Sequence, residues 1–191
     1  MSWPTIETIT SERLLLEPLS VDHAPEMAKV LAEVSIYEYT GGEAPSLEQL
    51  QLRYEAQAVG HSPDRSQGWF NWIVKPRGGG TPLGFVQATL ERRALEMVAN
   101  IAWVISPIHQ GQGIASEATL AMARWLQSRG VNTLVAYVHP EHHASMGVAR
   151  KQGLHPTSMT DGIEIRWESR QASSDSSSSP SRGHARQRGR V

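Results

Sequence analysis

Residues 98–129 constrain the fold of this chain more than any other stretch. Val98–Ile105 is a mostly apolar run with the length and β-branched content of a largely buried strand. Pro107 follows and ends that strand, and the loop after it contains Gly111 and Gly113. The next apolar residues recur at helical spacing, which indicates an amphipathic helix: Ala118, Met122, Trp125 and Leu126. The sequence therefore predicts a strand, a glycine loop and a helix in direct succession.

The glycine loop has the properties of an anion-binding site. Glycines let the backbone curl so that several N–H groups point into one hollow. The N-terminus of the following helix adds partial positive charge to the same place. We therefore predict that the loop binds a phosphate group.

Two common phosphate motifs fit this loop poorly. A P-loop has Lys followed by Ser or Thr after its last glycine, whereas Ile114 and Ala115 stand here. A dinucleotide fingerprint needs a third glycine or alanine where Ser116 stands, and an acidic residue at the end of the next strand. The predicted next strand, Thr133–Val138, is followed by His139 instead. The bare Gly-x-Gly is all that supports the dinucleotide alternative.

The loop resembles that of the GNAT (GCN5-related) N-acetyltransferases, in which a Q/R-x-x-G-x-G/A motif binds the pyrophosphate of acetyl-coenzyme A. The matching residues here are Gln110, Gly111, Gln112, Gly113, Ile114 and Ala115. The flanking A-W-V-I-S-P and S-E-A-x-x-A segments are similar to the family as well. The alternative is an ordinary strand–turn–helix with incidental glycines, and the rest of the chain distinguishes the two.

The order of the predicted elements is similar to that of the GNAT fold. The expected strands are Arg13–Glu17, Trp69–Lys75, Pro82–Leu90, Val98–Ile105, Thr133–Val138 and Ile163–Glu168. Two helices follow the first strand: one capped by Ser20 or Asp22 with Met27, Val30, Leu31 and Val34 on its apolar face, and one capped by Ser46. The helix after the loop ends at Gly130, and a short helix covers His142–Lys151.

This order, β-α-α-β-β-β-α-β-α-β, implies by resemblance an α/β fold with a mixed, mostly antiparallel sheet and helices on both faces. The opening S-x-R-L-x-L-x-P-L also resembles the branch that includes the ribosomal-protein acetyltransferases. We expect residues 1–169 to form one domain.

Residues 170–191 are expected to form a separate, disordered tail, because they are rich in Ser and Arg and poor in apolar residues. They hold five Arg and one Asp, a net charge of +4; since the chain carries −1, residues 1–169 carry −5. An acidic domain suits a cationic substrate and argues against a nucleic-acid surface. Weak anion or RNA association of the tail is the alternative to a solvated segment.

The chain has no cysteine, which excludes disulfides and thiolate catalysis and fits a reducing compartment. No apolar run is long enough to span a membrane, and residues 1–10 do not look like a signal peptide. We expect a soluble, cytoplasmic protein.

The GNAT resemblance implies direct attack by an amine on the thioester of acetyl-CoA, without an acyl-enzyme. It assigns the cofactor arm to a splayed strand end, here Trp103, Val104 and Ile105, where a backbone N–H would stabilise the oxyanion. A second family signature, N-x-x-S, reads His142-His143-Ala144-Ser145. Ser145 matches a serine that protonates the departing thiolate. His142 replaces the asparagine, and its imidazole can still bind the cofactor arm.

The general base is not fixed by the resemblance. Relatives often place a glutamate at or near the position of Asn100, and asparagine accepts no proton at neutral pH. Glu43 and Glu91 are the first candidates for the base, and Glu38 is the next. Alternatively, water carries the proton away. His139, His142 and His143 lie near Glu141, but no H-E-x-x-H spacing exists, so no metal is expected.

In the GNAT family the loop between the first two helices lines the acceptor site, which implies Tyr37, Glu38, Tyr39 and Glu43 here, with Asn100. Carboxylates recognise an amine, and tyrosine adds aromatic and hydroxyl contacts. The segments G-G-E-A-P-S-L, W-F-N-W-I-V, V-Q-A-T and H-P-E-H-H-A-S resemble a bacterial GNAT subgroup that includes kasugamycin N-acetyltransferases.

We therefore predict an antibiotic aminosugar as acceptor. The α-amine of a protein such as a ribosomal protein is the second candidate. A non-catalytic coenzyme A-binding module is the third, because Asn100 and His142 depart from the family pattern. A homodimer is implied only by the family.

Overall fold

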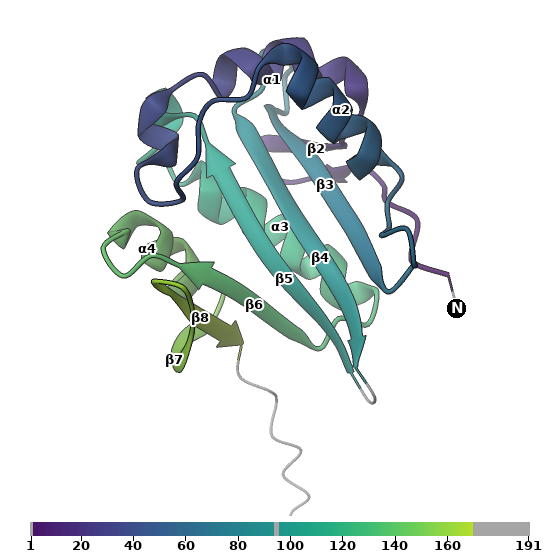
Figure 1. Ribbon diagram of the computed structural model, residues 1–191, viewed down its shortest axis with the longest axis vertical. Coiled ribbons are helices and arrows are strands. Elements are labelled where there is room, and N and C mark those ends of the chain that lie inside the picture. Colours follow the sequence, from purple (N-terminus) through teal and green to yellow (C-terminus); the bar gives the residue numbers. More distant parts are fainter. Residues whose placement is uncertain (1, 94–95, 170–191) are drawn as a thin grey trace, which may run out of the picture.

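The computed structural model describes residues 2–93 and 96–169, which form one twisted eight-stranded sheet with helices on both faces (Figure 1). The strands are β1 (Ile9–Thr10), β2 (Leu14–Pro18), β3 (Gln67–Pro76), β4 (Gly84–Arg93), β5 (Glu96–Ile105), β6 (Thr133–Val138), β7 (Leu154–Asp161) and β8 (Glu164–Ser169). Their order across the sheet is β1-β2-β3-β4-β5-β6-β8-β7. Every neighbouring pair is antiparallel except β5 and β6, which confirms the expected mixed, mostly antiparallel architecture.

The helices are α1 (Ala24–Val30), α2 (Leu47–Ala58), α3 (Ile114–Ser128) and α4 (His143–Lys151), with 3-10 turns η1 (Val21–His23), η2 (Val34–Tyr37) and η3 (Pro107–His109). Helix α3 covers one face of the sheet, and α1 and α2 cover the other (Figure 1). Over the described ranges, none of these helices is long and apolar enough to cross a membrane. The predicted tail at 170–191 lies outside the described residues.

Each face of the sheet buries its own apolar cluster. On the α3 side, Met122 and Leu126 pack against Trp72, which is fully buried. On the other side, Met27 of α1 and Leu50 of α2 pack over Ile73 in a smaller cluster. Trp72 and Ile73 are neighbours in β3 and point to opposite faces, as the pleat of a strand requires. The sheet is therefore fixed from both sides.

Most predicted elements are confirmed, and two predictions about α1 are wrong. Ser46 caps α2 as expected, and Gln49 completes a capping box with it. Helix α1 ends at Val30 and does not reach Val34, which starts η2 and is 81 % exposed. Ser20 caps the preceding turn η1 and not α1 itself, whose N-cap is His23.

Strand β7 is absent from the sequence-based prediction. Its sequence, L-H-P-T-S-M-T-D, has no alternation of apolar and polar residues, and only Leu154 is buried. It is an edge strand that pairs with β8 alone, and its register shifts between Pro156 and Thr160. Because one side of an edge strand faces solvent, little in its sequence marks it as a strand.

The feature that positions the site is the separation of β5 from β6. The two strands pair only from Val98 opposite Thr133 to Asn100 opposite Val135. Beyond this point β5 continues to Ile105 in register with β4, while β6 turns toward β8. Figure 1 shows the two strands diverging toward their C-terminal ends. A wedge therefore opens in the sheet beside the last residues of β5.

Candidate active site

A cavity of about 760 Å³ occupies the wedge between β5 and β6. One end is formed by the last residues of β5, the glycine loop (residues 110–113), the first turn of α3 and the start of α4. The other end lies on the α1/α2 side and is formed by residues 35–36 and 38–40, by Gln87 and Thr89 of β4, and by Asp161 and Glu164 of the β7–β8 hairpin. The cavity thus connects the two faces of the sheet.

The structure brings most of the sequence-predicted residues to this cavity. Its lining includes Glu38, Tyr39, Asn100, Trp103, Val104, Ile105, Gln110, Gly111, Gly113, Ile114, Ala115, His142 and Ser145. These residues come from four stretches of the chain, 38–39, 100–105, 110–115 and 142–145, so only the fold assembles them. Four predicted residues do not line it: Tyr37, Glu43, Glu91 and Gln112.

Each of these four residues has a different environment. The Gln112 side chain donates through Nε2 to the Ile108 carbonyl at 3.4 Å. The Tyr37 hydroxyl donates to the carbonyl of Leu31 at 2.8 Å, at the end of α1. Glu91 stands opposite Val98, far along β4 from the wedge, where it accepts from Gln67 Nε2 at 3.0 Å. Glu43 is exposed on its loop. These positions give neither Glu43 nor Glu91 access to the cavity.

The backbone of β5 presents peptide groups to the cavity in alternation. The Met97 carbonyl accepts from Asn132 N on the β6 side, whereas Ser106 N donates to the Leu83 carbonyl on the β4 side. By alternation the peptide groups of Trp103 and Ile105 face the wedge, and those of Val104 face β4.

The Ile105 carbonyl is taken by Gln110 Nε2 at 2.9 Å. The N–H groups of Trp103 and Ile105 therefore both face the wedge, where β5 has no partner strand. Gln110 has a structural contact as well as a place in the motif, because it ties the glycine loop to the end of β5.

The glycine loop has the conformation that the sequence predicts. Gly111 and Gly113 have φ of +74° and +78°, in the left-handed region that favours glycine. Gly113 is the N-cap of α3, and no side chain caps that end of the helix. The first-turn residues Ile114 and Ala115 line the cavity. Unpaired N–H groups at a helix start are the donor set that a pyrophosphate requires.

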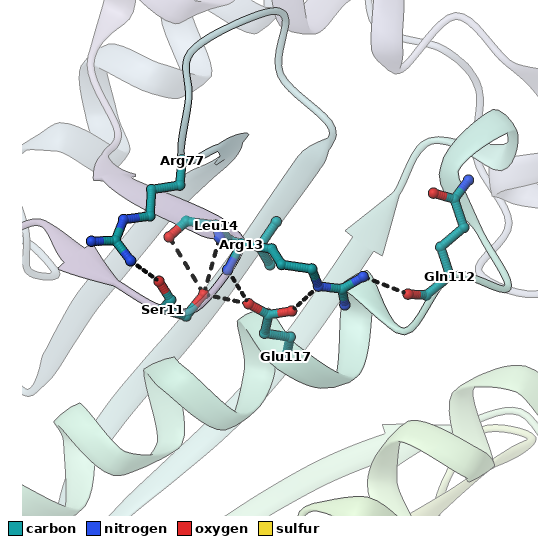
Figure 2. Close-up of polar contacts among 6 residues, drawn as sticks. All are labelled: Ser11, Arg13, Leu14, Arg77, Gln112 and Glu117. Carbon is teal, nitrogen blue, oxygen red and sulfur yellow. Dashed lines mark hydrogen bonds and ion pairs between the residues drawn. The ribbon is translucent and has the colours of Figure 1, made fainter.

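A polar cluster holds this loop from behind (Figure 2). Glu117, in the first turn of α3, accepts from Ser11 Oγ at 2.7 Å, from Arg13 N at 2.8 Å and from Arg13 Nε at 2.7 Å. The same guanidinium donates through Nη1 to the Gln112 carbonyl at 3.1 Å. Partial burial raises the pKa of Glu117, but these hydrogen bonds together outweigh it and leave the pKa below its usual value. Glu117 is therefore ionised at neutral pH.

An aromatic contact joins the two ends of the cavity. The ring of Tyr39, in the loop after η2, stacks on His142 at 4.5 Å with an angle of 19° between their planes. Tyr39 also lies 5.3 Å from His139. Burial lowers the pKa of His142, the nearby Glu38 charge opposes this, and His139 adds to the lowering. The net effect lowers the pKa of His142 from its usual value, which favours the neutral imidazole at pH 7.

The lowered pKa of His142 predicts a loss of stability in mild acid. As pH falls through about 6.5, the unfolded chain binds a proton at this histidine before the folded protein does, which favours unfolding. We expect the melting temperature of the wild type to fall more between pH 7.5 and 5.5 than that of His142→Asn. Thermal unfolding monitored by circular dichroism measures this difference. Parallel pH profiles for the two proteins would contradict it.

Three carboxylates line the end of the cavity on the α1/α2 side: Glu38, Asp161 and Glu164. Glu164 is half-buried, and no ion pair is found for any of the three within residues 2–93 and 96–169. Sequence reasoning missed Asp161 and Glu164 because it missed β7. The signal available was Asp161-Gly162, a frequent hairpin-turn pair, and Gly162 does have a φ of +56°. The excess negative charge favours a cationic ligand.

Comparison with known proteins gives one family match. The family described as "Acetyltransferase (GNAT) domain" matches residues 13–155. A comparison with curated proteins finds no match.

Solved structures share the fold at low sequence identity. An acetyltransferase from Agrobacterium tumefaciens has 24 % identity and a TM-score of 0.66, over 90 % of this chain and 98 % of that one. RimL, a ribosomal L7/L12 α-N-protein acetyltransferase in complex with coenzyme A, has 17 % identity and a TM-score of 0.70, over 85 % and 97 %. AAC(6')-Ib in complex with paromomycin and acetyl-CoA has 17 % identity and a TM-score of 0.67, over 83 % and 93 %.

Proposed function

The chain belongs to the GNAT acetyltransferase family, and from this premise we propose that it transfers an acetyl group from acetyl-CoA directly to an amine of a small cationic acceptor. The best candidate is an aminosugar antibiotic of the aminoglycoside type, such as kasugamycin. The observation that carries the proposal is the cavity in the β5–β6 wedge. One end has the glycine loop and helix start suited to binding a phosphate, and the other end has three carboxylates.

Acetyl-CoA supplies the acetyl group as an activated thioester. The glycine loop and the first turn of α3 would hold its pyrophosphate, because Gly111, Gly113, Ile114 and Ala115 line that end of the cavity. The Trp103 N–H faces the wedge, where it is placed to donate to a thioester oxygen as negative charge develops there. The chain has no cysteine to form an acyl-enzyme, which supports direct transfer.

The amine must lose a proton as it attacks, and we propose His142 for this role. Its imidazole lines the cavity, is neutral at pH 7 and lies beside Glu38, whose charge stabilises the protonated ring. Asn100, in the position that the family often gives to a carboxylate, lines the same cavity and can accept a hydrogen bond from the ammonium group. The cavity lining thus supports His142 over Glu43 and Glu91 as the proposed base.

Ser145 is proposed to donate a proton to the departing sulfur. It lies one turn after His142, near the start of α4, and lines the cavity. We expect Ser145→Ala to lower kcat about tenfold, the effect of losing one hydrogen bond, since a thiolate leaves readily without help. The KM for the acceptor should change less than twofold. Steady-state thiol release measures both constants, and an unchanged kcat would remove Ser145 from the reaction.

The carboxylates at the acceptor end favour an acceptor with more than one positive charge. An aminosugar antibiotic carries several amines on a compact, hydroxylated frame, which suits both the acidic residues and the polar Gln87 and Thr89. The similarity in fold to AAC(6')-Ib, solved with paromomycin, adds support. The α-amine of a ribosomal or other protein is the second candidate, and the similarity in fold to RimL favours it.

One experiment separates these candidates. The full-length protein is incubated with acetyl-CoA and a panel of aminoglycoside-type antibiotics, including kasugamycin, and with peptides bearing free N-termini. Thiol release is followed together with the mass of each acceptor. A gain of one acetyl group on an antibiotic supports the first candidate, and a gain on peptides alone supports the second. Binding of acetyl-CoA without any product would support a non-catalytic coenzyme A-binding module.

A further inference from the structure

Arg13 connects the turn between β1 and β2 to the glycine loop, and we propose that it is a positioning residue for acetyl-CoA. By holding the carbonyl of Gln112, it sets the direction of the Gly113 N–H. This inference rests on the proposed function, because it takes the pyrophosphate of acetyl-CoA as the ligand of the loop.

The guanidinium of Arg13 bridges the glycine loop and the first turn of α3, in addition to the backbone hydrogen bond from Glu117 N to the Gly113 carbonyl at 3.0 Å. Its Nε donates to Glu117 Oε2 in the first turn of α3, and its Nη1 donates to the Gln112 carbonyl in the loop. Figure 2 shows the side chain stretched between these two partners. The bridge therefore fixes the loop relative to the helix whose N-terminus it precedes.

The orientation of the Gly113 N–H follows from peptide geometry. There is no cis peptide bond in the described ranges, and in a trans peptide the C=O and the next N–H point in opposite directions. Since the Gln112 carbonyl points to Arg13, the Gly113 N–H points away from it. Gly113 lines the cavity in the wedge, and we infer that this N–H faces it.

A glycine loop needs such an external contact because its own backbone is poorly constrained. Gly111 and Gly113 can adopt many conformations, and a loop that is free to move loses binding energy when a ligand orders it. Arg13 removes part of this freedom before the ligand arrives. A side chain that reached only Glu117 or only the Gln112 carbonyl would not form this bridge.

Arg13 positions the loop and does not bind the phosphate itself, because its charge is already balanced by Glu117. Glu117 forms an ion pair with it at 2.7 Å and is held in place by Ser11 as well. A residue that bound the phosphate directly would need its charge free for the ligand. Lysine at this position would keep the charge, but a single ammonium group cannot replace the two directed contacts.

Isothermal titration of the full-length protein with acetyl-CoA tests this role. We expect Arg13→Ala and Arg13→Lys each to weaken binding about tenfold, the usual effect of losing one hydrogen bond that orders a ligand site. Arg77→Ala is the matched control, because the Arg77 side chain reaches the same turn through the Ser11 carbonyl, at 3.5 Å, and among the described residues forms no hydrogen bond or ion pair with the Gln112 carbonyl or Glu117. Its affinity for acetyl-CoA should equal that of the wild type. Hydrogen exchange of residues 110–117 in the free protein should be faster in both Arg13 variants.

The outcomes are distinct. Wild-type affinity in both Arg13 variants would overturn the inference, and so would an equal loss in Arg77→Ala. Arg13→Lys keeps an ion pair with Glu117 within reach, so it remains informative if Arg13→Ala unfolds. A wild-type protein that does not bind acetyl-CoA would overturn the proposed function, and with it this role of Arg13. In kinetics, the KM for acetyl-CoA should rise while kcat at saturation stays within about twofold.

Discussion

Gly84→Ala is expected to lower the free energy of unfolding by about 3–5 kcal/mol, from backbone strain and overpacking together. Gly84 is the first residue of β4 and has a φ of +155°, which side chains rarely tolerate. A Cβ there would stand 2.0 Å from the Val104 carbonyl oxygen and 2.9 Å from the Ile105 Cα. Both are backbone atoms, so no side-chain rotation relieves the contact.

The clash falls on the strand that borders the cavity. To admit the methyl group, β4 must move away from β5 at the pairs formed by Val104 and Ile105. The same residues form the wall of the wedge, so acetyl-CoA binding should fall together with stability. Urea unfolding gives the loss of stability, and the melting temperature should fall by about 10 °C or more for a domain of this size.

Gly78→Ala is the control for this variant. Gly78 lies in the turn before β4, its φ is not positive, and a Cβ there would meet nothing within 4 Å. Its stability should lie within about 0.5 kcal/mol of the wild type. If Gly84→Ala unfolded at the same urea concentration as Gly78→Ala, the close approach of β4 and β5 described here would be wrong.

The sequence was sufficient where one local pattern decides the structure. β6 has the bounds predicted from T-L-V-A-Y-V, and the capping box at Ser46 starts α2 as expected. The strand, loop and helix around Gly111 and Gly113 were also correct, since positive φ is what glycine adds to a turn. In each case the signal lies within a few residues.

Prediction failed where pairing between distant strands decides. Glu91 and Asn100 lie in adjacent strands, but the register puts Glu91 opposite Val98 and Thr89 opposite Asn100. Only the second pair lies at the wedge. Because strand register is fixed by tertiary packing, no local pattern ranks Glu38 above Glu91. Arg13 was visible only as part of a family motif, and its contact with the Gln112 carbonyl required the fold.

Two carboxylates at the proposed acceptor end of the cavity, Asp161 and Glu164, were missed for the same reason. Glu164 belongs to a hairpin whose first strand has no periodic pattern, and its partner across the turn, Asp161, is exposed. The sheet order places β8 beside β6, which brings Glu164 to the cavity that Tyr39 and Glu38 reach from the other side. A carboxylate set drawn from segments more than a hundred residues apart cannot be read from spacing.

Glu164→Gln is expected to lower kcat/KM for a cationic acceptor about 10- to 100-fold, since a hydrogen bond to a charged group contributes about 1.5–3 kcal/mol. Glu164 is the half-buried member of the three carboxylates, so its charge is the least screened by solvent. The substitution keeps the shape of the side chain and removes only the charge. The affinity for acetyl-CoA, bound at the other end of the cavity, should not change.

Glu43→Gln is the matched control, because it removes the same charge from a residue that does not line the cavity. It should leave kcat/KM for the acceptor within about twofold of the wild type, as expected for an exposed charge screened by solvent. The measurement is steady-state thiol release with the acceptor varied at saturating acetyl-CoA. Added salt should weaken acceptor binding more in the wild type than in Glu164→Gln, because the variant already lacks the electrostatic attraction of the Glu164 charge. Equal losses in the two variants would mean that net charge attracts the acceptor and that no carboxylate of the cavity contacts it.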